Sequence, residues 1–282
     1  MRQAAGKVEE RVRNYIGARD LYKSSLLISP SSPTLLAYAM LEISHPIEKE
    51  CNYTQVAGLF EEALLLDPRH GPVYNAYGNM ELKLGNVGKA RQIYQNGVYA
   101  NCRDNASVYH GLAMLELSLG NVETARLVLM KGLKEFRIND SGMDSNRRKR
   151  AIFLAQSLGM LELNCRRASA AKIVFETGIE QHGNSSQLLL GSALCEAKLG
   201  NDNAARGFFE RAVRVDRKHS QAWQSWGVME MRSGNYKVAK TLFKCGIKND
   251  SRHGALWQAY GKYNVIVNAT FCRIVDHFKS HT

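Results

Sequence analysis

The sequence contains little proline, no long apolar run and no paired cysteine motif. Five prolines in 282 residues favour a chain built from helices, because proline breaks helix interiors. No apolar run reaches the ~18 residues needed to cross a bilayer, and the N-terminus has no apolar signal core. We therefore expect no membrane-spanning segment. The six cysteines show no C-x-x-C spacing, which favours reduced, buried thiols over a metal or redox site.

The sequence also lacks the motifs that carry catalysis. It has no nucleotide-binding glycine loop and no nucleophile elbow, and its eight histidines are scattered without the spacing of metal ligands. We therefore expect a non-enzymatic protein with no cofactor, no metal site and no small-molecule substrate.

Acidic residues are outnumbered, because 38 Lys and Arg against 26 Asp and Glu give a net charge of +12. Such a balance favours phosphate-rich polymers, acidic proteins or anionic surfaces as partners. The densest basic run lies in an insert at about residues 137–150 and comprises Arg147, Arg148, Lys149 and Arg150. It is either a solvated loop or the basic start of a helix, or alternatively an arm that contacts phosphates.

One glutamate recurs with a spacing close to 34 residues, which indicates a repeat protein. It stands at Glu9, Glu42, Glu81, Glu116, Glu162, Glu196 and Glu230, and the next slot holds Asn264. Four of these glutamates are followed by Gly-Asn, at Gly85-Asn86, Gly120-Asn121, Gly200-Asn201 and Gly234-Asn235. Glycine suits the left-handed end of one helix and asparagine suits the cap of the next. Each unit therefore predicts two helices joined by a tight turn.

The second helix of each unit places a small residue and an aromatic residue four apart, with a further small residue three positions on. Ala239, Phe243 and Gly246 are an example. The small residues should let paired helices approach closely, and aromatics such as Trp226 and Phe243 should form the core between helices. One helix pair cannot bury its apolar face alone, so the units must stack.

The sequence therefore predicts an all-α, right-handed superhelical solenoid of about seven helix-turn-helix repeats over residues 1–264. Residues 265–282 do not match a second helix and form a tail or a capping helix. The first unit is truncated, because Met1 falls where about half a helix should precede it. Either the chain is a fragment of a longer array, or this short helix is its N-terminal cap.

The order of residues in these units resembles tetratricopeptide (TPR) repeats. The segments Y-N-A-Y-G-N-M-E from Tyr74 and W-Q-S-W-G-V-M-E from Trp223 make it more similar to HAT repeats, a variant of TPR. A basic residue follows six of the seven glutamates by ten positions, as in Glu81 with Arg91 and Glu230 with Lys240. We expect this pair to meet within one repeat and fix the hairpin.

The resemblance implies a function in RNA processing. The regular units look most like the organellar HAT proteins that stabilise and process chloroplast transcripts, which implies single-stranded RNA as the partner and the chloroplast as the location. The alternatives are a protein–protein scaffold inside a nuclear RNA-processing complex, with other proteins of that complex as partners, and a generic TPR co-chaperone adaptor.

The first helices should line the concave face of such a solenoid, and their polar residues recur once per repeat. Amides there could read base edges and cations could hold phosphates, whereas an ordinary solvated groove would carry similar residues. The candidate ligand-binding residues are Asn75, Lys83, His110, Gln156, Asn164, Lys198, Gln224, Arg232 and Gln258.

Overall fold

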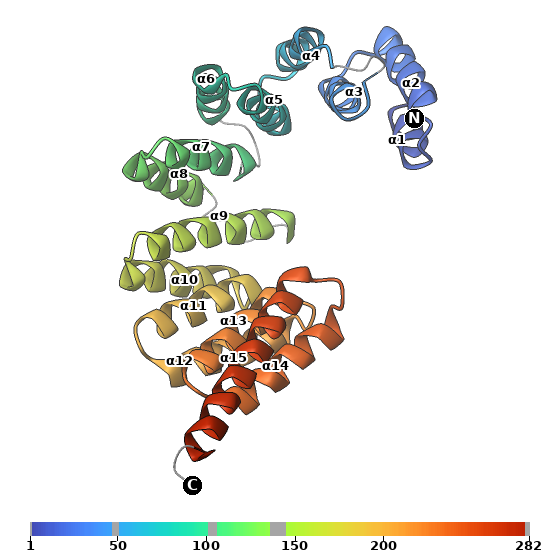
Figure 1. The fold of residues 1–282 in the computed structure, drawn as a ribbon. Helices are drawn as coiled ribbons and strands as arrows, with labels where there is room; N and C mark the ends of the chain where they lie inside the picture. The colour runs from blue at the N-terminus through green and yellow to red at the C-terminus, as the bar shows by residue number, and fades with distance from the viewer. Residues whose placement is uncertain (1, 47–50, 101–105, 136–144, 280–282) are drawn as a thin grey trace. The chain divides into compact units, whose positions relative to one another are not determined.

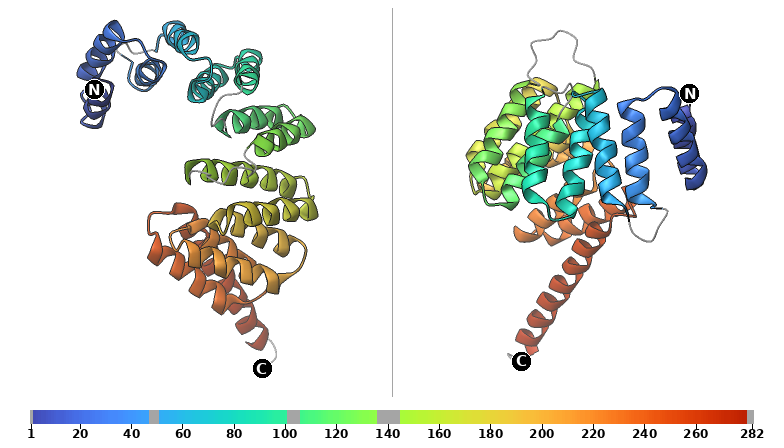
Figure 2. Two further views of the ribbon diagram at one scale, coloured as in Figure 1. Left: turned by 180° about the vertical axis from the view of Figure 1, so that it is seen from behind. Right: turned by 90° about the horizontal axis from the view of Figure 1, so that it is seen from above.

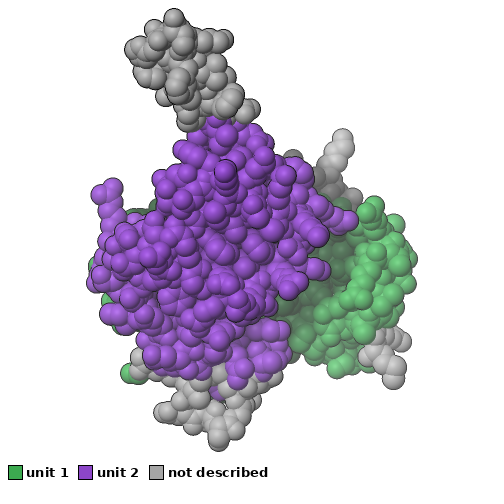
Figure 3. Space-filling view, turned by 90° about the horizontal axis from the view of Figure 1, so that it is seen from below, with its two compact units in different colours: residues 1–136 green, residues 137–282 purple. Residues whose placement is uncertain are grey.

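The computed structural model describes residues 2–46, 51–100, 106–135 and 145–279 (Figure 1). Every regular element in these ranges is an α-helix, which confirms the all-α prediction. None of the described helices is both long and apolar enough to cross a bilayer. The chain divides into two compact units, unit 1 at residues 1–136 and unit 2 at residues 137–282 (Figure 3).

Unit 1 is built from helices of 10 to 14 residues. They are α1 (Arg2–Arg11), α2 (Tyr15–Ile28), α3 (Ser32–Ser44), α4 (Tyr53–Leu66), α5 (Gly71–Lys83), α6 (Val87–Tyr99), α7 (Ala106–Ser118) and α8 (Val122–Glu135). Unit 2 contains two longer helices, at its start and at its end. Its helices are α9 (Ser145–Asn164), α10 (Ala168–His182), α11 (Ser186–Lys198), α12 (Asp202–Val215), α13 (Ser220–Arg232), α14 (Tyr236–Asn249) and α15 (Gly254–Lys279).

Within each unit, consecutive helices form antiparallel pairs, and each pair packs on the next (Figures 1 and 2). The first helices of neighbouring pairs also contact one another, as α3 with α5, α5 with α7, α9 with α11 and α11 with α13. This is the arrangement of a TPR-like solenoid, as predicted. The first helices therefore share one face of the stack in each unit.

The Gly-Asn turns end the first helices with the same pattern of backbone hydrogen bonds. Gly85 has a φ of +80°, its N–H donates to the Leu82 carbonyl at 3.1 Å, and the Asn86 N–H donates to the Glu81 carbonyl at 2.9 Å. These two bonds define a Schellman motif. The equivalent glycines also have positive φ values, at Gly120, Gly200 and Gly234. The predicted tight turns are confirmed.

The predicted role of the asparagine is wrong. Asn86 occupies the N-cap of α6, but its side chain makes no capping bond to that helix. Its Nδ2 instead donates to Glu81 Oε2 at 2.7 Å. A charged acceptor forms a stronger hydrogen bond than a neutral one, so the carboxylate fixes the orientation of the amide. The same contact recurs at Asn121–Glu116, Asn201–Glu196 and Asn235–Glu230.

Two repeats make the same turn without glycine. Arg13 and Arg166 have φ values of +64° and +60°, and each follows a repeat glutamate by four positions. The Asn14 N–H donates to the Glu9 carbonyl at 2.9 Å, as in the glycine turns. Position in the repeat therefore identifies these left-handed residues where residue type does not.

In four second helices the basic residue pairs with the glutamate of the following repeat, which corrects the prediction of a pair within one repeat. Arg91 Nε donates to Glu116 Oε1 at 2.6 Å, and Arg206 Nε donates to Glu230 Oε1 at 2.7 Å. The pairs Arg19–Glu42 and Lys172–Glu196 repeat this contact at 2.7 Å. The reason is that the second helix lies between two first helices, and its basic residue faces the later one. These ion pairs therefore join repeats.

These partners favour the ionised form of Glu116 and Glu196. The hydrogen bond from Arg91 lowers the pKa of Glu116 below its usual value, although burial opposes the shift. The hydrogen bond from Lys172 similarly lowers the pKa of Glu196, with a contribution from Asn201. A buried charge needs such partners, so the glutamate, its asparagine and the preceding repeat's cation form one structural group.

Four buried aromatic rings of second helices pack against glycines of first helices, as expected: Tyr22, Tyr94, Phe175 and Phe243. Tyr94 is fully buried between Gly78 of its own repeat and Gly111 of the next. A Cβ atom at either glycine would lie 2.6 Å from a carbon of the ring. Phe243 is also fully buried, which confirms its predicted core position, whereas Trp226 is only partly buried. Trp226 stacks on Phe209 with ring centroids 6.1 Å apart.

Two features of unit 2 bear on the remaining predictions. The basic run at residues 147–150 lies in the first turns of α9, so it is a helix start rather than a loop, while residues 137–144 of the insert lie outside the described residues. The predicted boundary between array and tail, at residues 264 and 265, lies inside α15 and stays a prediction.

Candidate functional site

A groove of about 510 Å³ lies on the face of unit 2 that its first helices share. Helices α9, α11 and α13 line it, with contributions from α12. It brings together four of the predicted ligand-binding residues: Asn164, Lys198, Gln224 and Arg232. Three of these, all except the half-buried Gln224, are exposed at the surface.

The other predicted residues lie outside this groove. Gln156 in α9 is half-buried, and Gln258 in α15 is exposed. In unit 1, Lys83 is exposed, whereas Asn75 and His110 are half-buried. Burial lowers the pKa of His110, so it is a weak cation for phosphate binding. The proposed ligand-binding role of all nine residues stays a prediction.

Two charged groups of the groove, those of Lys198 and Asp202, form hydrogen bonds with other groups of the protein. Lys198 Nζ donates to the Leu163 carbonyl at 3.0 Å, which holds its ammonium group between α9 and α11. Asp202 places a negative charge in the groove, and its Oδ2 accepts a hydrogen bond from Ser233 Oγ at 2.9 Å. Arg232 is exposed beside them. The groove is therefore mixed in charge rather than uniformly basic.

The floor of the groove is apolar, which sequence reasoning missed. Met160, Leu194 and Val228 line it, and each stands two residues before a repeat glutamate. This shared position, two residues before the repeat glutamate, is the sequence signal that could have predicted the apolar floor. It was hidden because the position varies in residue type, with Asn79 in α5 and Lys262 in α15. The three side chains form a ladder, one per repeat, between the polar residues.

The groove offers no exposed aromatic ring among its lining residues. Phe209 is the aromatic residue of that lining, and it is fully buried. Binding of single-stranded nucleic acid usually uses aromatic side chains on which bases stack. The groove therefore suits a ligand that is held by apolar side chains and hydrogen bonds.

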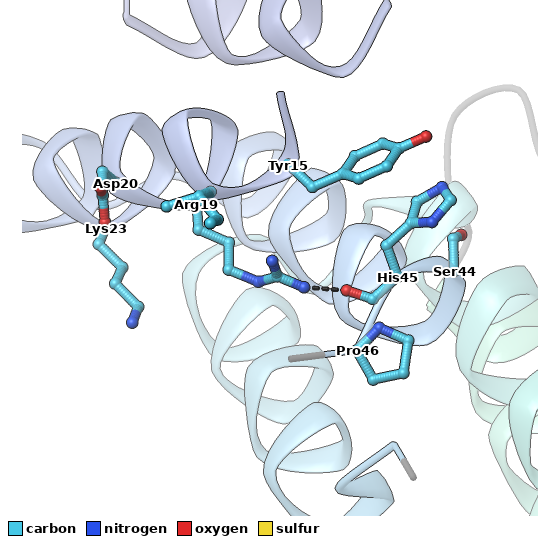
Figure 4. A pocket seen from close by; sticks show the side chains of 8 residues that line it. Tyr15, Arg19, Asp20, Lys23, Ser44, His45 and Pro46 are labelled. Atoms are coloured by element: carbon cyan, nitrogen blue, oxygen red, sulfur yellow. Dashed lines mark hydrogen bonds between the residues drawn. The ribbon is translucent and has the colours of Figure 1, made fainter. Parts of the chain in front are cut away.

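A second pocket, in unit 1, lies between α2 and the end of α3 (Figure 4). Tyr15 stacks on His45 there with ring centroids 3.7 Å apart. Arg19 donates to the His45 carbonyl and to Glu42 Oε1. Its guanidinium group thus holds α2 against α3. We therefore assign this pocket a structural role.

The described residues contain no cluster of His, Cys, Asp or Glu that could hold a metal ion. Burial raises the pKa of the Cys195 thiol to about 12, so that thiol is unreactive at neutral pH. The described cysteines Cys51, Cys165, Cys195 and Cys245 are all unpaired.

Comparison with known proteins supports the fold. No family model matches the sequence, and no curated protein matches it. Yeast Tom70 is similar in structure, with a TM-score of 0.62 and 17% identity over 92% of this chain and 51% of Tom70. The chain thus spans about half the length of that protein.

Two further solved structures share the arrangement. A tetratricopeptide repeat protein from Parabacteroides merdae matches with a TM-score of 0.55 and 13% identity over 93% of this chain and 97% of that one. A chain of the APC/C hetero-tetramer Cut9-Hcn1 matches with a TM-score of 0.53 and 13% identity over 88% and 52%. At these identities the likeness concerns the fold, and the chain is TPR-like in fold.

Proposed function

We propose that the protein is a non-enzymatic scaffold that binds an extended segment of a protein partner in the groove of unit 2. The observation that carries this proposal is the apolar ladder of Met160, Leu194 and Val228 flanked by amides and cations. An extended peptide presents side chains alternately to opposite sides. It can place apolar side chains on the ladder while its backbone bonds to amides such as Gln224.

The charges at the groove favour a partner segment that combines apolar and acidic residues. Lys198 and Arg232 lie on the first helices, and Asp202 lies nearby, so a single acidic residue fits better than a long acidic run. The structural likeness to a chain of a multi-subunit assembly supports a scaffold role. The HAT-like motifs support an RNA-processing complex as its setting, in the nucleus or in the chloroplast.

Direct binding of single-stranded RNA is the second candidate function. The net charge of +12 supports it, as do Arg148 and Lys149, which are exposed in the first turns of α9. RNA would then be held chiefly through phosphates, since the groove exposes no ring for stacking among its described lining.

Peptide selection on the intact protein tests the scaffold proposal. A random peptide library displayed on phage is selected against the wild-type chain alone, and the enriched peptides are then measured against Val228→Glu, which places a charge on the apolar floor. Enriched peptides should pair apolar residues with an acidic one. They should lose affinity about tenfold or more for Val228→Glu and less for Arg232→Ala. Peptides that bind both proteins equally would refute the groove as the site.

A salt titration tests the RNA alternative. Affinity for single-stranded RNA should fall with salt by a log–log slope of about −0.7 per phosphate contact. Replacing Lys83, Lys198 and Arg232 by alanine should flatten that slope if they hold phosphates. Absence of RNA binding near physiological salt, together with intact peptide binding, would leave the scaffold function alone.

A further inference from the structure

Two helix pairs are joined by reciprocal contacts between an aromatic residue of one helix and a glycine of the other. In α13–α14, Gly227 packs on the Phe243 ring, where a Cβ atom built at the glycine would lie 2.5 Å from a ring carbon. Gly246 packs on Trp223 and on Leu256 of α15, where a built Cβ atom would lie 2.8 Å from the Cβ atom of Trp223 and 2.7 Å from Leu256. In α5–α6, Gly78 packs on Tyr94 and Gly97 on Tyr74 in the same way. Each helix therefore contributes one aromatic residue and one glycine to these contacts. The ring and the glycine are four residues apart on the first helix and three apart on the second.

Helix α15 has the aromatic residue and the glycine that a first helix contributes to these contacts. Trp257 and Gly261 stand in the register of Trp223 and Gly227. Here both are uncovered: Trp257 is 50% exposed, and no described atom lies within 4 Å of a Cβ built at Gly261. Gly78 and Gly227, by contrast, are buried. The chain continues as one helix to Lys279 instead of turning back to form a second helix (Figure 2).

The uncovered strip is distinct from the face that docks α15 onto its unit. Leu256, Ala259 and Tyr263 are buried in a cluster with Phe243, and they anchor α15 against α14. Val265, which is 69% exposed, extends the uncovered strip by one turn beyond Gly261. The helix is thus held in place on one side and presents Trp257, Gly261 and Val265 on another.

We propose that this strip binds an α-helix supplied by another protein, with the pattern Ala-x-x-x-Phe/Tyr-x-x-Gly. The pattern follows from what the chain places on the same positions elsewhere, as Ala239, Phe243 and Gly246. The partner's ring fills the space over Gly261, and its glycine lets it approach Trp257. Such a short helix is marginal alone and gains its order on binding, with its apolar face laid into a groove.

The binding is tested with the intact chain and a peptide of residues 235–249, acetylated and amidated, as the probe. The protein is labelled with ¹⁵N at its three tryptophans, whose indole signals are assigned with Trp257→Phe and Trp223→Phe. Titration should shift the Trp257 signal and leave those of Trp223 and Trp226 in place. A shift of Trp223 instead would mean that the peptide displaces α14, which would overturn the proposal.

Matched variants locate the contact. Gly261→Leu fills the space that the partner's ring would occupy and should weaken peptide binding about tenfold or more. Gly207→Leu makes the same change at another exposed helical glycine with open space around it and should leave binding unchanged. In the peptide, Phe243→Ala should weaken binding to a similar extent. Absence of binding to the wild-type chain, or equal binding by Gly261→Leu, would refute the proposal without touching the groove function.

Discussion

Arg166 illustrates how strongly repeat position constrains a single residue. It has a left-handed backbone with a φ of +60°, at the place where other repeats have glycine. A left-handed conformation costs a residue with a side chain about 1–2 kcal/mol. The helix ends there regardless, because the Arg167 N–H donates to the Glu162 carbonyl at 2.9 Å. The turn is therefore imposed by the rest of the repeat.

Arg166→Gly should stabilise the protein by about 0.5–1 kcal/mol, since relief of the left-handed strain outweighs the greater freedom of glycine in the unfolded chain. Urea denaturation measures the change. Arg167→Gly is the control, because its φ of −103° is accessible to any residue, and this change should give no gain. Equal effects of the two substitutions would contradict the assignment.

At the scale of helices, serine–histidine contacts connect successive first helices. Ser186 Oγ lies 2.5 Å from His219 Nδ1 and donates its hydrogen to the Ala212 carbonyl at 3.0 Å. The Nδ1–H of a neutral His219 is therefore the donor to Ser186. Ser32 and His70 repeat the contact at 2.5 Å. Burial lowers the pKa of both histidines, although nearby aspartates oppose the shift.

This shift predicts a loss of stability on mild acidification. A histidine with a lowered pKa in the folded state contributes stability that is present above its unfolded pKa of about 6.5 and is lost as pH falls through the folded value. The denaturation midpoint should thus fall as pH drops from about 7 to 5. His219→Gln keeps a donor without a titrating group and should flatten this dependence. An unchanged pH profile would exclude His219 as a contributor.

The sequence was sufficient for the helices and turns because these depend on neighbouring residues. The repeat glutamates and the Gly-Asn pairs located the turns before the structure did. The partner of Arg91 could not be read in this way, because Glu116 lies in the next repeat and the choice depends on which helix the side chain faces. The apolar floor was missed because Met160 and Val228 share a register but no residue type.

At the scale of the whole molecule, each helix contacts near neighbours in the chain, so stability is approximately a sum over repeats and their interfaces. Phe243→Ala removes a fully buried ring and should destabilise its repeat by about 3–5 kcal/mol. Hydrogen exchange should show the loss of protection in α13, α14 and α15. Protection in α3 to α6 should be unchanged, and a uniform loss over all helices would show that the chain unfolds as one unit.

The ion pairs between repeats affect how this chain could exchange modules by recombination. A crossover between a second helix and the next first helix separates Arg91 from Glu116, or Arg206 from Glu230. A crossover inside a Gly-Asn turn keeps those ion pairs but separates the aromatic residues and glycines that pack together within one helix pair. A transplanted repeat therefore needs a predecessor with the right cation or a second helix with the right ring. The repeat-glutamate position that follows Lys240 is occupied by Asn264. A repeat grafted after α14 would therefore need a glutamate at that position to form the ion pair with Lys240.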